Sequence, residues 1–174
     1  MKAALALAMS LALAASPAVA QTRCLTQPEA EALTQVALPG IIRQTGTVCA
    51  ARLPATSLLR QSGGAFVAKY DAAADRAWPT ARAALVKLSD PMVTSLLDSD
   101  YARPLLVTMV APLIVGRIAT EDCPTIDTLV TNLAPLPAQN AASIIVTTLR
   151  YLQAEKAKGR GVAVPDLPLC PGNR

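Results

Sequence analysis

The 174-residue chain contains no histidine. This absence excludes a serine or cysteine nucleophile activated by histidine, a histidine-ligated zinc ion and a switch based on histidine protonation. Aromatic residues are also scarce, with one tryptophan, three tyrosines and one phenylalanine. So few rings make a surface on which sugars or bases stack hard to build.

Charged residues make up only 16% of the chain, and the formal net charge is +4. The basic residues are scattered singly, whereas nucleic-acid binding needs a basic stripe that neutralises several phosphates. Ser62-Gly63-Gly64 followed by Lys69 lacks the glycine before the lysine and the hydroxyl residue after it that a phosphate loop requires. We therefore expect no nucleic-acid partner and no cofactor, and we interpret the glycine pair as a turn.

Long hydrophobic runs are missing as well. Residues 3–15 are apolar apart from Ser10, but a helix of this length covers about 20 Å, less than the roughly 30 Å of a hydrocarbon core. Lys2 precedes this run and Ala18-Val19-Ala20 follows it, which is the pattern of a signal peptide cleaved after Ala20. We expect a periplasmic or secreted protein with no transmembrane anchor after cleavage.

The remaining sequence predicts an all-α fold, because short β-branched runs lie inside stronger helical periods. We expect one domain over residues 21–159, a compact orthogonal or bundle-like array of about six to seven short helices. Residues 160–174 contain three prolines and are predicted to form an irregular tail.

Local signals place the ends of several helices. Thr26 and Glu29 form a capping box, and the helix that they start should end or bend at Pro39-Gly40. Gly159 stands where a left-handed C-terminal cap belongs. The other predicted helices cover residues 53–61, 65–76, 91–97, 124–134 and 140–158, with a restart of the helical pattern at Trp78-Pro79.

Two segments are predicted to be buried by their apolar residues. Residues 105–118 are apolar around the whole helix circumference, which is typical of a helix buried on all sides, with a kink at Pro112. The short helix after Asp90 is expected to turn its apolar residues inward; these are Met92, Val93, Leu96 and Leu97.

The four cysteines, at positions 24, 49, 123 and 170, contain no Cys-x-x-Cys motif and predict two structural disulfides in an oxidising compartment. If residues 124–134 and 140–158 pair antiparallel, the tail is long enough to join Cys123 to Cys170. Cys24–Cys49 then remains as the second bond. That pairing requires a chain reversal at Pro39-Gly40, because an unbroken helix would hold its ends roughly 30 Å apart.

Residues 69–82 carry the highest density of distinctive side chains. Tyr70, Trp78 and Arg82 are candidates for a ligand or partner surface, with Arg82 binding an anionic group. The alternative is that Trp78 anchors the core, Tyr70 lies at its boundary and the charges face solvent.

A carboxylate site is a further candidate. Asp98 and Asp100 could bind a cation or act as an acid and a base, with Glu121 as a third carboxylate. The alternative is that Ser99 or Asp100 caps the helix near Tyr101 and that Glu121 lies at a helix N-terminus.

These observations leave three functions open. The first is a non-enzymatic domain that binds another envelope protein or supports the envelope. The second is a carrier of a small apolar ligand, and the third is a carboxylate hydrolase acting on cell-wall material. A flat apolar patch would favour partner binding, whereas a deep apolar cavity would favour the carrier.

Overall fold

The computed structural model describes residues 23–171, so the predicted signal peptide at residues 1–20 lies outside the described residues. Within the described range the chain forms six α-helices, two short 3-10 helices and a single isolated β-bridge. The predicted all-α fold class is confirmed. The elements are α1 (Gln27–Val48), η1 (Leu58–Arg60), α2 (Ala65–Leu88), α3 (Pro91–Leu97), α4 (Ala102–Val115), η2 (Thr120–Asp122), α5 (Cys123–Leu133) and α6 (Ala138–Ala157).

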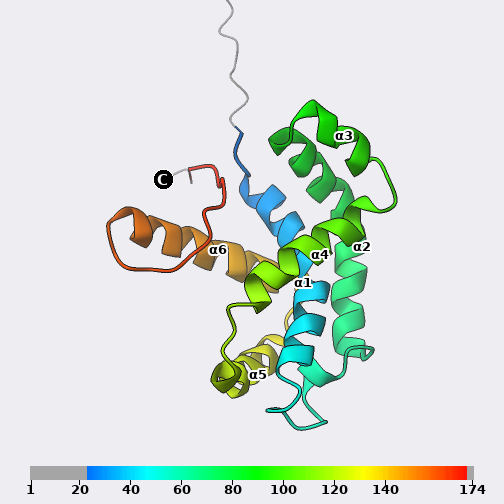
Figure 1. The fold of residues 1–174 in the computed structure, drawn as a ribbon, viewed down its shortest axis with the longest axis vertical. Helices are drawn as coiled ribbons and strands as arrows, with labels where there is room; N and C mark the ends of the chain where they lie inside the picture. Colours follow the sequence, from blue (N-terminus) through cyan, green and yellow to red (C-terminus); the bar gives the residue numbers. More distant parts are fainter. Residues whose placement is uncertain (1–22, 172–174) are drawn as a thin grey trace, which may run out of the picture.

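Helix α1 is the central element. It contacts α2, α4, α6 and η1, and Figure 1 shows α4 lying across α1 while α2 runs beside α1 in the opposite direction. The core therefore forms around α1, not around the apolar segment at residues 105–118.

The N-terminus of α1 is fixed by the predicted capping box. The Thr26 backbone N–H donates to Glu29 Oε2 over 2.7 Å, and Lys87 at the end of α2 donates to the same oxygen over 2.5 Å. Desolvation raises the pKa of Glu29, but the hydrogen bonds from Lys87 and Thr26 outweigh it, so that this pKa lies below its ordinary value. A single carboxylate thus joins the start of α1 to the end of α2.

The interface of α2 with its neighbours is built mainly from alanine. Most buried residues of α2 recur at alternating steps of three and four positions, which places them along one face of the helix, and Ala73 adds to this face from beside Ala74. The buried residues are Val67, Tyr70, Ala73, Ala74, Ala77, Ala81 and Ala84. Small side chains let two helices approach closely along their length. The predicted break between residues 76 and 78 is wrong, because this continuous face packs through Pro79 as one helix.

The predicted end of α1 at Pro39-Gly40 is also wrong. The helix continues to Val48, and Gly40 serves a packing role: a Cβ at this position would overlap Cγ1 of Val107 on α4. Pro39 is buried within the same helix. The glycine therefore lets α4 approach the backbone of α1, and no chain reversal occurs there.

The continuous α1 corrects the disulfide pairing. The bonds are Cys24–Cys170 and Cys49–Cys123, with Cα–Cα distances of 4.9 and 5.5 Å, and the predicted Cys24–Cys49 and Cys123–Cys170 bonds are wrong. A 22-residue helix is about 33 Å long, so Cys24 and Cys49 lie at opposite ends of it. Each must pair with a cysteine from a distant part of the chain.

The C-terminal tail is held at several points. Gly159 has a φ of 80°, so the predicted left-handed cap of α6 is confirmed. Beyond it, Leu25 forms a parallel bridge with Leu169, and Gln153 on α6 donates to the carbonyl oxygen of Pro165 over 3.0 Å. The tail therefore returns along α6 to the start of α1.

We predict that proteolysis without reduction will release peptides joining Cys24 to Cys170 and Cys49 to Cys123. Replacing both Cys49 and Cys123 by alanine should lower the free energy of unfolding in a denaturant titration. The sequence separation of 74 residues implies a loss of about 4 kcal/mol on the chain-entropy scale. A recovered Cys24–Cys49 peptide would contradict the observed fold.

We also predict that Gly40→Ala destabilises the protein by about 1–3 kcal/mol, because the added methyl group displaces Val107. Helix propensity alone would change stability in the opposite direction by about 1 kcal/mol. Gly63→Ala is the control, since no atom lies within 4 Å of its added Cβ, and it should change stability by less than about 0.5 kcal/mol. Equal denaturation midpoints for Gly40→Ala and the wild type would refute the close contact.

Candidate functional site

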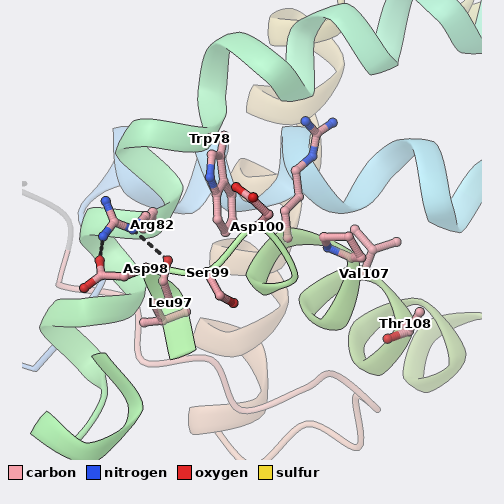
Figure 2. A pocket seen from close by; sticks show the side chains of 10 residues that line it. Trp78, Arg82, Leu97, Asp98, Ser99, Asp100, Val107 and Thr108 are labelled. Carbon is pink, nitrogen blue, oxygen red and sulfur yellow. Dashed lines mark hydrogen bonds and ion pairs between the residues drawn. The ribbon is translucent and has the colours of Figure 1, made fainter. Parts of the chain in front are cut away.

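A groove of about 730 Å³ lies between α2, the turn that joins α3 to α4, and the first half of α4 (Figure 2). Its walls combine one tryptophan with charged and small polar residues. The lining residues are Trp78, Arg82, Leu97, Asp98, Ser99, Asp100, Arg103, Pro104, Val107 and Thr108.

This groove brings together four of the candidate residues. Trp78 and Arg82 come from α2, and Asp98 and Asp100 come from the α3–α4 turn. Tyr70 is not part of this surface, because it is 3% exposed and packs in the core against Phe66. Its burial raises the pKa of the phenol.

The guanidinium group of Arg82 already binds other groups of the same chain. It forms an ion pair with Asp98, and its Nε donates to the carbonyl oxygen of Leu97 over 2.8 Å (Figure 2). Arg103, the second cation of the groove, pairs with Asp75 on α2. Both cations thus hold the α3–α4 region against α2, and neither presents a free charge to an anionic ligand.

Two of the three candidate carboxylates have positions that differ from those of an acid and base pair in the groove. Asp98 is engaged by Arg82, and Glu121 is exposed on η2 and does not line the groove. The predicted cap is absent too: Tyr101 is the N-cap residue of α4, and no side chain caps that end. Among residues 23–171, no group of three or more His, Cys, Asp or Glu residues could hold a metal ion.

Lys69 binds backbone carbonyl groups at the end of α5. Its ammonium group donates to the carbonyl oxygens of Ala134 and Leu136, over 2.7 and 2.8 Å, just after α5 ends. It also lies over the rings of Phe66 and Tyr70, and burial lowers its pKa. The lysine satisfies carbonyl groups at a helix C-terminus, which agrees with the interpretation of Gly63-Gly64 as a turn.

Sequence reasoning missed a row of exposed apolar side chains on α4. Leu105, Met109 and Leu113 on α4 are 42%, 70% and 70% exposed, so the prediction that residues 105–118 are buried on all sides is wrong. Only the side of α4 that faces α1 is covered, where Ala111 and Val115 are buried. The sequence of α4 is apolar around its whole circumference because apolar residues lie both on the side that packs against α1 and on the side that faces solvent.

The neighbouring helix α3 shows the same departure. Met92 is 90% exposed, Val93 and Leu96 are also exposed, and Leu97 alone is buried. The predicted inward orientation is therefore wrong for three of the four residues. Tyr101, in the turn between α3 and α4, is 74% exposed. We use the name α3–α4 face for Met92, Leu96, Tyr101, Leu105, Met109 and Leu113.

Within residues 23–171, no single helix is both long and apolar enough to cross a bilayer. The segments Ala102–Val115 and Thr120–Leu133 pass that test only when taken together, and they are bent by 92° relative to each other. No protein-family model, no curated protein and no solved structure matches this chain. The geometry of the site is thus the basis for any functional proposal.

We predict that Arg82→Ala loosens the α3–α4 region. The loss of the ion pair with Asp98 and of the hydrogen bond to Leu97 should lower stability by about 1–2 kcal/mol. It should also speed amide hydrogen exchange in residues 90–101 more than elsewhere. Arg76→Ala is the matched control on the same helix, because Arg76 is exposed and forms no ion pair within the described range. Equal exchange rates in the two variants would contradict the assignment.

Proposed function

We propose that this chain is an exported, non-enzymatic helical domain that binds a protein partner through the α3–α4 face. The observation that carries the proposal is the exposure of Leu105, Met109 and Leu113 on a helix whose opposite side packs against α1. Large contiguous apolar patches are uncommon on monomeric proteins and mark sites of interaction. Methionine and tyrosine, which both occur here, are enriched at protein interfaces.

The groove beside this face supports partner binding over the carriage of a small apolar ligand. A carrier needs an enclosed, mostly apolar cavity. Here the groove opens to solvent, and Arg82, Asp98, Asp100 and Arg103 stand among its lining residues. A partner that covers α4 would extend over the rim of the groove at Pro104 and Thr108.

The proposal of a hydrolase has weaker support. An acid and base pair requires two carboxyl groups in different environments across a substrate site. The candidate carboxylates instead include one that is paired with Arg82 and one, Glu121, that lies on another element. The chemistry of the groove is therefore better explained as structural support for the α3–α4 face.

Export is part of the same proposal. Both disulfides are compatible with a protein that folds in an oxidising compartment. The pattern of residues 1–20 favours a cleaved signal peptide. We place the mature chain in the periplasm or outside the cell, where its partner would be another envelope protein or a chain of the same kind.

The proposal is tested by placing a photo-crosslinking amino acid at Leu105, Met109 or Leu113, one position per variant, in the full chain, expressed in a bacterial host that exports it or in its native cell. Crosslinks should form at Met109 because its side chain lies in the centre of the apolar stripe on α4. Thr128 on α5 is the control position, since it is exposed but lies outside the α3–α4 face. Lack of adducts at Leu105, Met109 and Leu113, under several growth conditions, would overturn the proposed function.

A further inference from the structure

Five exposed residues on α4 and at its two ends form an evenly spaced row. Tyr101, Leu105, Met109, Leu113 and Arg117 recur at every fourth position, and all five are exposed. The pattern is symmetric about Met109, with a leucine four residues away on either side. Residues spaced by four form a continuous ridge on the surface of an α-helix.

The backbone carries this spacing beyond both ends of α4. Tyr101 has φ −83° and ψ −12°, and Gly116 has φ −64° and ψ −7°, so both lie in the α region. The backbone N–H of Arg117 donates to the carbonyl oxygen of Ile114 over 3.2 Å. The five side chains therefore follow one helical path.

A second copy that lies antiparallel on this ridge would match it residue by residue. With Met109 on the two-fold axis, Leu105 would face the partner's Leu113, and Leu113 would face the partner's Leu105. A two-fold interface requires this reciprocity, because the same patch serves on both subunits. Helices whose ridges of this spacing fit into each other's grooves cross at about −50°, the commonest crossing angle in globular proteins, so two α4 helices would make their closest contact around Met109.

The ends of the ridge have complementary chemistry. In the same arrangement Tyr101 would meet the partner's Arg117. Tyr101 is 74% exposed, and Arg117 is exposed and forms no ion pair within residues 23–171. A guanidinium group over a tyrosine ring is attracted by the charge distribution of the ring. The antiparallel arrangement thus supplies each end with a partner that the monomer lacks.

The apolar area of the ridge supplies most of what a dimer requires. The exposed apolar side chains on the ridge are Tyr101, Leu105, Met109 and Leu113. At roughly 200 Å² for a fully exposed large side chain, their exposed fractions amount to about 500 Å². A standard interface buries about 800 Å² on each partner, so neighbouring residues such as Thr108, Pro112 and Arg117 would supply about 300 Å² more.

We propose that the α4 ridge is the interface of a two-fold homodimer, in which two α4 helices cross antiparallel at Met109. This inference rests on the proposed function, because it names a second copy of this chain as the partner that covers the α4 part of the α3–α4 face. It also gives Met109, Leu105 and Leu113 distinct places in the dimer, which allows the geometry itself to be tested.

The test uses single cysteine substitutions in the full mature chain. No free cysteine is present within the described residues, so no native thiol competes with the added one for disulfide formation. Under mild oxidation, Met109→Cys should give a crosslinked dimer because the two copies of this residue meet on the axis. A mixture of Leu105→Cys and Leu113→Cys chains should crosslink more than either variant alone. Thr128→Cys, the control, should remain uncrosslinked.

Molar mass in solution provides the second measurement. The wild type should have twice the mass of one chain in light scattering, and Met109→Glu should raise the dimer dissociation constant by about 30-fold or more. Circular dichroism would confirm that this variant is folded, and Met109→Leu should retain the dimer. Arg117→Ala should weaken the dimer by a smaller factor of about 3 to 5.

The outcomes separate this inference from the proposed function. A monomeric wild type that still photo-crosslinks to a different protein at Met109 would overturn the dimer and leave partner binding in place. A dimer in which Met109→Glu has no effect would also overturn the inference, since another surface would then join the chains. A monomer without crosslinks at any α4 position would refute both.

Discussion

The continuity of α1 through Pro39 and Gly40 is the constraint on which the rest of the structure depends. A helix of 22 residues keeps its two ends about 33 Å apart, and a cysteine flanks each end. Cys24 is joined to the tail at Cys170 and Cys49 to the start of α5 at Cys123. The same helix provides the surface on which α2, α4 and α6 pack. Both disulfides thus attach later parts of the chain to the ends of α1.

The sequence could predict what depends on local chemistry. The Thr26–Glu29 capping box, the left-handed Gly159 and the all-α class are confirmed, because caps and periodicity act over a few residues. Pro39-Gly40 and Trp78-Pro79 carry the local signals of helix boundaries, yet both lie inside continuous helices. At both places packing against a neighbouring helix outweighs the local preference to stop. In addition, Gly40 and Val107, which are in close contact, are far apart in the sequence. A local sequence pattern cannot predict such a contact.

The candidate site was predictable in its residues but not in their roles. Trp78, Arg82, Asp98 and Asp100 do line one groove, yet the ion pair between Arg82 and Asp98 depends on how α3 folds back on α2. The apolar face was missed for a different reason. An all-round apolar helix such as α4 is compatible with burial inside one chain and with burial between two chains. Composition alone does not distinguish the two cases.

The groove and the α3–α4 face are better understood as one arrangement. Arg82 binds Asp98 and the Leu97 carbonyl group, and Arg103 binds Asp75, so the charges of the groove join the α3–α4 region to α2. Each polar group used in this way is withdrawn from ligand binding and catalysis. What it provides instead is a fixed position for α4, whose inner side is held against α1 at Gly40. A rigid helix that exposes Met109 and Leu113 loses little conformational entropy when it is covered, which is the property expected of a preformed protein interface.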